Sequence, residues 1–402
     1  MFMRISLQVL AIVLVMADMS CSKTDDKVEK EPENPVVPVT PAEPEEPQKT
    51  EDPQKPEVPV TPVEPEAPQK PEEDPSEATN ERSPEAVKLL DYLKSIYGEK
   101  TLSGACTNVN WNTNEAQWVY KHTGKWPAIN CFDFIHLPFS QPGGWIDYSN
   151  LKVVEDWHQA GGIVAIMWHW NVPANNGSDW SFYYGNETDK TKFDVRKIFD
   201  ESSLEYKRMI KDIDLVGSYL KTLKDKGIPV IWRPLHEAGG RWFWWGMDAA
   251  ACQQLWKVMY KRFAEAGINN LIWAFTPAAA WQEPYSKGFD WYPGDEYVDI
   301  VGMDVYNQSS ASDCYTLDFK FLQTQKPEKL AALTECGNVA TISSQWNAGA
   351  KWLFFMPWYD YGRTSDPQSA AFNEQSHSNA SISWWKDAFN SDYVLSRDDV
   401  KY

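Results

Sequence analysis

Hydrophobic and polar positions alternate in blocks from residue 83 to the end of the chain. Eight short, apolar, strand-like runs are separated by longer amphipathic or charged stretches with helical spacing. This alternation predicts βα units around a parallel sheet. The runs cover residues 101–106, 127–134, 162–170, 228–237, 270–277, 298–307, 329–337 and 351–358. The clearest helix signals cover residues 83–97, 204–226 and 249–266, and the first of these opens on Ser-Pro-Glu.

Eight such runs in about 320 residues fit a (β/α)8 TIM barrel with elaborated loops. A doubly wound open sheet is the alternative, but no Gly-x-Gly-x-x-Gly motif follows the first run to support it. In a barrel of parallel strands, the reactive groups lie at the carboxyl ends of the strands. The last few residues of each run are therefore the candidates for a functional site.

The first 82 residues lack this pattern. Residues 22–82 contain no apolar side chain larger than valine and 14 of the 27 prolines, so they cannot bury enough surface to offset the entropy of ordering. Residues 35–49 recur at 56–70 with twelve of fifteen positions identical, which predicts a stiff spacer of polyproline II character. We expect residues 21–82 to form a disordered Pro/Glu-rich linker and residues 83–402 to form one globular domain.

A short apolar segment begins the chain. Residues 1–20 carry Arg4 and then an apolar run too short to span a membrane, which indicates an export signal peptide. The junction at Ser20 and Cys21, followed by acidic residues, resembles the signals of Bacteroidetes surface lipoproteins, with Asp18 as a departure. The resemblance implies a lipid anchor at Cys21 and an outer-membrane lipoprotein exposed at the cell surface. A periplasm-facing or simply secreted protein, with Cys21 lost or free, is the alternative.

Charge and composition exclude several classes of function. The formal net charge is −19, and the acidity that remains outside the linker argues against nucleic-acid binding, which needs a basic face. Five cysteines follow Cys21, an odd number without Cys-x-x-Cys spacing, so neither a disulfide framework nor a zinc site is expected. No cofactor is indicated. All 21 tryptophans follow residue 110, a density of aromatic faces that favours stacking on sugar rings.

Two of the apolar runs end on a glutamate. Glu237 precedes a cluster of aromatic residues, and Glu335 lies 98 residues further on. With the strand count above, they lie three βα units apart and face each other across the barrel mouth. A lone glutamate at a strand end is more commonly a salt bridge or a helix cap, but two at matched positions favour catalysis. Glycosidic bond cleavage needs a proton donor and a carboxylate beside the anomeric carbon, and spacing alone does not say which glutamate supplies which.

Residues 85–390 resemble glycoside hydrolase family 26, whose best-known members are β-mannanases. The resemblance is densest in Arg-Pro-Leu-His-Glu at 233–237 and Trp-Phe-Trp-Trp-Gly at 242–246. It implies a (β/α)8 barrel and a retaining mechanism, with Glu237 as acid/base and Glu335 as nucleophile. The positions that match substrate-binding residues of the family are His169, His236, Trp242, Asp304, Tyr306 and Trp358.

The resemblance implies a role for most of these side chains. His169 matches the histidine that contacts the sugar before the scissile bond, and Trp358 matches the tryptophan platform. Tyr306 matches the tyrosine that hydrogen-bonds the nucleophile, with Asp304 on the same face of the strand. Trp242 matches a ring of the following subsite. Each has a structural alternative, such as a packed histidine or a core aromatic residue.

Neighbouring residues are expected to have supporting roles. Arg233 is expected to orient a carboxylate through a fork of hydrogen bonds, and Cys336 to be a small buried hydrophobe. At least one of Trp244 and Trp245 is expected to lie in the core. A metal site at His236 is not expected, because no histidine follows at i+4.

Three hypotheses follow for the function. The first is a retaining, endo-acting β-1,4-mannanase that hydrolyses mannan, glucomannan or galactomannan, and acts as a monomer. The second is the same fold acting on mixed-linkage β-glucan or β-1,3-xylan. The third is a non-catalytic glycan-binding surface lipoprotein, which is disfavoured because binding alone does not need two carboxylates facing one bond. An aromatic-rich insertion at residues 173–199 would narrow the cleft, so endo and exo action both stay open.

Overall fold

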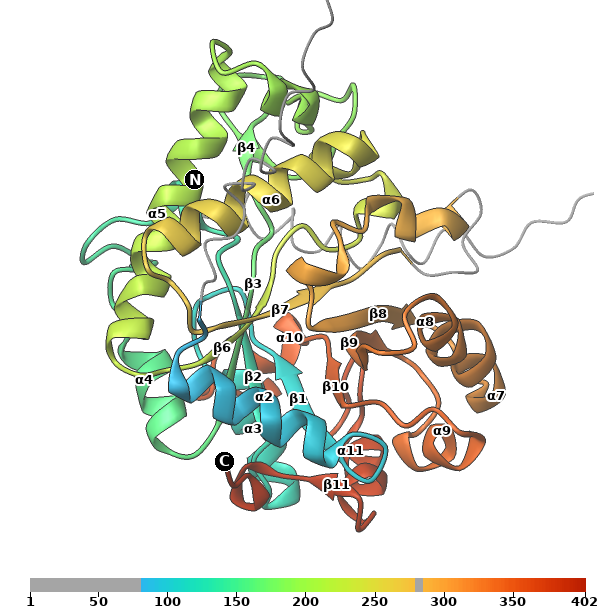
Figure 1. Cartoon of the computed structure of the whole chain (residues 1–402). Coiled ribbons are helices and arrows are strands. Elements are labelled where there is room, and N and C mark those ends of the chain that lie inside the picture. The colour runs from blue at the N-terminus through green and yellow to red at the C-terminus, as the bar shows by residue number, and fades with distance from the viewer. Residues whose placement is uncertain (1–80, 279–284) are drawn as a thin grey trace, which may run out of the picture. The chain divides into compact units, whose positions relative to one another are not determined.

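A closed barrel of eight parallel strands forms the centre of the domain (Figure 1). The computed structural model describes residues 81–278 and 285–402. Each barrel strand pairs in parallel with the next, and the last pairs with the first through Leu102 and Phe354. The predicted (β/α)8 barrel is therefore confirmed and the open sheet is excluded. The strands are β1 (Thr101–Cys106), β2 (Ile129–Asp133), β3 (Ile163–Met167), β6 (Val230–Arg233), β7 (Leu271–Phe275), β8 (Ile300–Tyr306), β9 (Leu330–Gly337) and β10 (Phe354–Pro357).

Helices surround the barrel, and the three helices predicted from the sequence are confirmed. Their starts follow from capping side chains, because Ser83, Ser203 and Asp248 each accept a hydrogen bond from a backbone N–H of the first turn. Each such cap is worth about 1 kcal/mol. The helices are α2 (Pro84–Ile96), α3 (Asn114–Thr123), α4 (Lys152–Gln159), α5 (Leu204–Asp225), α6 (Ala249–Glu265), α7 (Ala311–Asp313), α8 (Lys320–Gln325), α9 (Ile342–Ala348), α10 (Tyr361–Thr364) and α11 (Ile382–Phe389).

Several short elements elaborate the barrel and were not predicted. The insertion after β3 contains a hairpin of β4 (Val172–Pro173) and β5 (Trp180–Ser181). Strand β11 (Val394–Leu395) pairs in parallel with the start of β1, and a π-helix at Cys314–Phe319 links α7 to α8. Strands of two residues are too short to produce a period in the sequence, which is why the apolar pattern did not reveal them.

Tryptophan fills much of the core. Among the largest fully buried side chains are Trp118, Trp168, Trp170, Trp232, Trp244, Trp245, Trp256, Trp352 and Trp385. The high tryptophan count is therefore largely a feature of packing, and both members of the Trp244–Trp245 pair lie in the core. The five described cysteines are buried free thiols, and the expected burial of Cys336 is confirmed.

The predicted signal peptide, the lipid-anchor position Cys21 and almost all of the predicted linker lie outside the described residues. The last linker residue that the structure describes, Arg82, forms an ion pair of 2.6 Å with Asp299. Within residues 81–278 and 285–402, no helix is both long enough and apolar enough to cross a membrane.

Candidate active site

A strained turn after β6 presents Glu237. Leu235 and Glu237 both adopt left-handed backbone conformations, with φ of 50° and 53°. Non-glycine residues adopt this conformation at a cost of about 1–3 kcal/mol each, and such strain is common at functional sites. Two bonds hold the turn: the Glu237 N–H donates to the Thr276 carbonyl over 2.8 Å, and Trp245 Nε1 donates to the His236 carbonyl over 2.9 Å. The aromatic segment thus fixes the position of the glutamate.

Gly246 lets the aromatic segment approach this turn. A Cβ atom at this position would lie 2.2 Å from the carbonyl oxygen of Ala238, which is too close for any side chain. Trp244, two residues earlier, donates from Nε1 to the Trp170 carbonyl over 2.7 Å. Packing beneath Glu237 therefore explains the Trp-Trp-Gly sequence. Both indoles are buried, and the glycine allows its backbone to approach the backbone of Ala238.

Strand β9, three strands further around the barrel from β6, presents Glu335. An irregularity in the β8–β9 ladder brings Glu335 opposite Asp304, although Leu333 pairs with the preceding Met303. Thr334 is the extra residue, and its hydroxyl donates to Asp304 Oδ1 over 2.6 Å. Such a bulge re-aims side chains next to many active sites.

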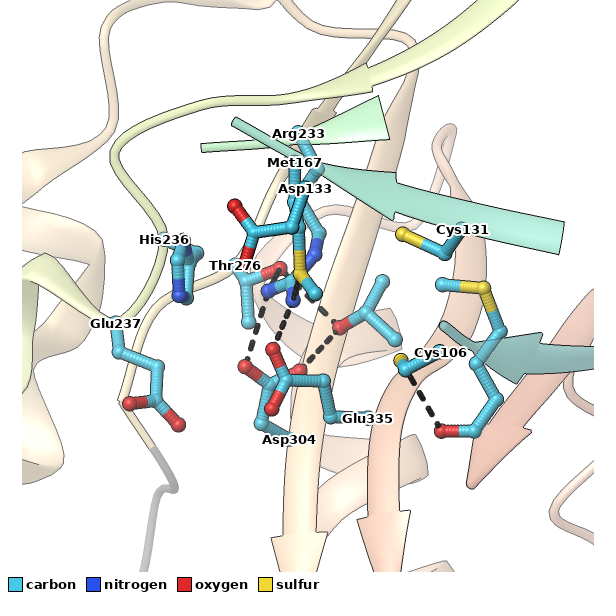
Figure 2. Close-up of polar contacts among 12 residues, drawn as sticks. Cys106, Cys131, Asp133, Met167, Arg233, His236, Glu237, Thr276, Asp304 and Glu335 are labelled. Carbon is cyan, nitrogen blue, oxygen red and sulfur yellow. Dashed lines mark hydrogen bonds and ion pairs between the residues drawn. The ribbon is translucent and has the colours of Figure 1, made fainter. Parts of the chain in front are cut away.

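Arg233, the last residue of β6, connects the carboxylates (Figure 2). Its Nη1 donates to Asp304 Oδ2 over 3.0 Å, and its Nη2 forms an ion pair with Glu335 Oε1. The Tyr306 hydroxyl donates to the other oxygen, Glu335 Oε2, over 2.8 Å. The predicted fork of Arg233 is confirmed, and the tyrosine bond implied by the resemblance is present. Both Asp304 oxygens are occupied by Arg233 and Thr334, which favours a supporting position over direct contact with a sugar.

The two glutamates lie in one buried cluster but have unequal surroundings. Figure 2 shows the Glu237 side chain to one side of Asp304 and Glu335. Burial, followed by repulsion from Asp304 and Glu335, holds the pKa of Glu237 well above its ordinary value. Burial and repulsion from Asp304 raise the pKa of Glu335 to about 7, while Arg233, His169 and the Tyr306 hydrogen bond lower it. Arg233 and Tyr306 contact Glu335 directly, so the surroundings favour the ionised form of Glu335 more than that of Glu237.

Two histidines lie beside this cluster and contact each other. His169 Nδ1 lies 2.6 Å from Asp133 Oδ2, and its backbone N–H donates to Asp133 Oδ1 over 3.0 Å. His169 Nε2 lies 3.1 Å from His236 Nε2. Burial, together with Arg233 and His169, holds the pKa of His236 well below its ordinary value, so this imidazole is neutral at neutral pH. The Asp133 carboxylate thus sets the orientation of the His169 ring.

Aromatic side chains from the loops after β6 and β10 contact the glutamates and the histidines. Trp242 Nε1 donates to Glu237 Oε2 over 2.9 Å, which ties the indole to the carboxyl group. The Trp358 ring packs edge-on against His169, with centroids 5.7 Å apart. All eight predicted site residues therefore belong to one contiguous group at the carboxyl ends of β3, β6, β8, β9 and β10.

Three residues of this group were missed by the sequence analysis. Asp133 ends β2, so extending the strand-end rule to that strand would have found it. Tyr183 comes from the insertion, which bridges to Phe243, and burial with the Glu237 and Glu335 charges raises its pKa. The Tyr359 hydroxyl is buried and has no hydrogen-bond partner among the described residues. Tyr183 lies in the insertion that was expected to narrow the cleft, and Tyr359 directly follows Trp358, but nothing in the sequence assigned either tyrosine a role.

The described residues offer no cluster of three or more His, Cys, Asp or Glu side chains suited to a metal ion. The arrangement instead provides one carboxyl group whose raised pKa favours its protonated form, one carboxyl group held by a cation and a phenol, and neutral hydrogen-bonding groups. These groups can protonate a leaving oxygen and stabilise a positive charge at carbon.

We expect Tyr306→Phe to shift the acidic limb of the pH profile to higher pH. The tyrosine hydroxyl donates to Glu335 and lowers its pKa, so its loss raises that pKa and leaves less carboxylate at low pH. A hydrogen bond to a charged group is worth about 1.5–3 kcal/mol, so kcat/KM should fall by about ten- to a hundredfold below pH 6. Profiles of kcat/KM against pH, with Tyr120→Phe on α3 as the control, test this. An unmoved acidic limb would contradict it.

A (β/α)8 barrel with two buried glutamates at strand ends is an architecture that glycoside hydrolases use. The model for glycosyl hydrolase family 26 matches residues 78–399, and the chain belongs to this family. A mannan endo-1,4-β-mannosidase of Thermothelomyces thermophilus is 34% identical over 318 residues, covering 78% of this chain and 61% of that protein. One from Bacillus subtilis is 29% identical, covering 73% of this chain and 82% of the relative.

Solved structures show the same similarity. The family 26 domain of an endo-β-mannanase/endo-β-glucanase from Prevotella bryantii is 36% identical, with a TM-score of 0.70, covering 81% of this chain and 99% of that domain. A β-mannanase from a symbiotic protist of the termite Reticulitermes speratus, in complex with a gluco-manno-oligosaccharide, is 31% identical with a TM-score of 0.68, covering 80% of this chain and 96% of that one. The chain spans 47% of the length of mannan endo-1,4-β-mannosidase B from Piromyces.

Proposed function

We propose that this protein is a retaining, endo-acting β-1,4-mannanase that hydrolyses mannan, glucomannan or galactomannan. The observation that carries the proposal is the unequal environment of two glutamates in one buried cluster. Glu335 is held by Arg233 and Tyr306, whereas Glu237 is hydrogen-bonded to Trp242 and has a raised pKa that favours its protonated form. Two carboxyl groups whose surroundings separate their pKa values are the equipment of acid-assisted nucleophilic displacement.

The reaction proceeds in two displacements. The Glu335 carboxylate attacks the anomeric carbon while the protonated Glu237 donates its proton to the departing glycosidic oxygen, which breaks the bond and leaves a glycosyl ester on Glu335. The Glu237 carboxylate then takes a proton from water, and that water attacks the same carbon and releases Glu335. Two inversions at one carbon give overall retention of configuration.

The remaining site residues hold the sugar and the catalytic groups. His169 and His236, held to each other and to Asp133, form one wall beside the sugar that precedes the scissile bond, and Trp358 supplies the platform under that sugar. Trp242 lies on the leaving-group side, beside the acid that it hydrogen-bonds. Tyr306 and Asp304 keep Glu335 and Arg233 in register, so that the nucleophile is aimed before substrate arrives.

Named relatives favour mannan as the substrate. The curated relatives described above are mannan endo-1,4-β-mannosidases, and the protist β-mannanase binds a gluco-manno-oligosaccharide. A second candidate is mixed-linkage β-glucan, because the Prevotella protein is described as an endo-β-mannanase/endo-β-glucanase.

A product profile on purified mannan, galactomannan, glucomannan, lichenan and β-1,3-xylan tests the choice of substrate. We expect oligosaccharides from the first three; products only from lichenan or xylan would overturn the substrate assignment.

We propose further that Cys21 carries a lipid that anchors the protein to the outer membrane, facing the cell exterior. The support is the apolar run of residues 1–20 and the acidic residues that follow Cys21. The expected result is that Cys21→Ser moves the protein from the membrane fraction to the soluble fraction, and that external protease releases the wild-type enzyme from intact cells. Membrane association that survives the substitution would contradict the anchor.

A further inference from the structure

Trp145 differs from the other described tryptophans in its exposure. Its side chain is 54% exposed, and every other tryptophan that the structure describes is buried or only partly exposed. The residue lies in the loop between β2 and α4, on the carboxyl face of the barrel that also carries the glutamates. An indole left in water on this face costs hydrophobic free energy unless a ligand covers it.

A groove of about 410 Å³ adjoins the Trp145 ring. It is formed by the loops that follow β1 and β2 together with the first turn of α4. Its lining includes Asn110, Trp111, Trp145, Asp147, Asn150 and Lys152. The volume lies within the range of small-ligand sites, and the lining combines two aromatic rings with amide and carboxylate groups.

The polar groups of the groove suit a neutral ligand rich in hydroxyl groups. The side-chain oxygen of Asn110 is buried and accepts no hydrogen bond from the described protein atoms. Hydrogen bonds from Ser149 and the Gly143 N–H lower the pKa of Asp147, so this acceptor stays charged. Lys152 is paired with Asp156 over 2.7 Å. The groove thus offers acceptors without free positive charge, which disfavours an anionic ligand.

The groove is held by packing beneath it. Trp111 has a left-handed backbone with φ of 56°, and its buried ring contacts Phe132, Phe134 and Tyr148 at centroid distances of 5.1, 5.3 and 4.7 Å. A non-glycine residue in this conformation needs surrounding structure to stabilise it. The groove wall is therefore positioned before any ligand binds.

His136 connects Trp145 to the catalytic centre. The two rings lie 4.9 Å apart between centroids, and burial lowers the pKa of His136 to about 4, so the support behind the indole is uncharged at neutral pH. His136 interacts electrostatically with Asp133, which in turn holds His169. Trp145 is thus separated from the catalytic centre by a short run of packed side chains.

We propose that the groove at Trp145 is a second sugar-binding site, which holds a segment of the same β-linked polysaccharide away from the bond being cut. The indole provides a stacking face for a pyranose ring, and Asn110 and Asp147 accept hydrogen bonds from its hydroxyl groups. The inference rests on the proposed function for the identity of the ligand. A second site of this kind should lower KM for polymeric substrates and leave KM for short substrates unchanged.

The test compares Trp145→Ala with Tyr120→Ala, a control that removes a 44% exposed ring on α3 outside the groove. On soluble mannan, Trp145→Ala should raise KM about tenfold with kcat unchanged, which corresponds to about 1.4 kcal/mol of lost binding. On an aryl β-mannobioside both variants should match the wild type. Asn110→Ala should raise KM for the polymer about threefold, since it removes a smaller contact.

Binding is measured separately by retardation in mannan-containing native gels, with Glu335→Ala as the background to prevent digestion. Adding Trp145→Ala should weaken retardation, whereas adding Tyr120→Ala should not. An unchanged KM and unchanged retardation for Trp145→Ala would overturn the second site while leaving the mannanase proposal intact. If the wild type cleaves another polysaccharide of the panel and not mannan, the mannanase proposal fails, and the Trp145 comparison is decided on the polysaccharide that is cleaved.

Discussion

Glu335→Ala should abolish mannan hydrolysis, with kcat reduced on the order of 10⁵-fold, while binding to mannan persists. The substitution removes the carboxylate that Arg233 and Tyr306 hold for attack, and no other described carboxylate has these partners, since Asp304 is engaged by Arg233 and Thr334. Initial rates on mannan, together with native-gel retardation, measure both parts. Glu201→Ala, at an exposed position before α5, is the control and should match the wild type.

A small nucleophile should partly restore the lost step. Azide can enter the space left by the Glu335 carboxyl group and attack the anomeric carbon of an activated aryl β-mannobioside, which gives an α-glycosyl azide. Residual activity equal to that of the wild type in Glu335→Ala would remove the nucleophile assignment. A thermal unfolding profile like that of the wild type is expected, because losing Glu335 also removes its repulsion with Asp304.

Glu237→Ala should separate substrates by their leaving groups. The buried, protonated Glu237 is needed only where the departing oxygen is a poor leaving group, so kcat/KM on mannan should fall by about 10³–10⁴-fold. For a dinitrophenyl β-mannobioside, whose leaving group departs without protonation, kcat/KM should stay within about tenfold of the wild type.

The pH profile supplies a second readout for Glu237. The raised pKa of this acid sets the basic limb of the kcat/KM profile, since activity is lost as the proton leaves at higher pH. Glu237→Ala should therefore lose the basic limb on the activated substrate and keep the acidic limb set by Glu335. Equal losses on mannan and on the dinitrophenyl substrate would contradict the assignment of Glu237 as the acid.

The barrel could be predicted because each of its strands is an apolar run long enough to be seen. All eight predicted runs contain the observed strands, and the Ser-Pro-Glu segment at Ser83 marked the start of the first helix. The β4–β5 hairpin and the π-helix left no such signal, since two-residue strands have no period and a π-helix differs from an α-helix by its hydrogen bonds alone.

Most of the candidate site was predicted from residues at or just after strand ends, although Asp133 at the end of β2 was missed. Glu335 and Tyr306 follow from strand positions, whereas Tyr183 reaches the glutamates through the bridge between the insertion and Phe243. The irregular β8–β9 ladder, which brings Glu335 opposite Asp304, also left no trace in the apolar pattern. Contacts between distant loops depend on three-dimensional packing, which local periodicity does not encode.

The high tryptophan content predicted sugar binding, but most of the described indoles are buried in the core. Trp244 and Trp245 are fully buried, and they support the Glu237 turn through hydrogen bonds to backbone carbonyls. Composition counts aromatic rings without saying which face solvent. Exposure identifies Trp145 as the described tryptophan most open to solvent.

Trapping the glycosyl-enzyme tests the central claim most directly. The enzyme is incubated with 2-deoxy-2-fluoro-β-mannobiosyl fluoride, which forms the ester readily and releases it slowly, and the labelled peptide is located by mass spectrometry. We predict a single adduct on Glu335 and none in the Glu335→Ala variant. An adduct on Glu237 or Asp304, or no adduct while mannan is cleaved with inversion, would contradict the proposed roles of the two glutamates.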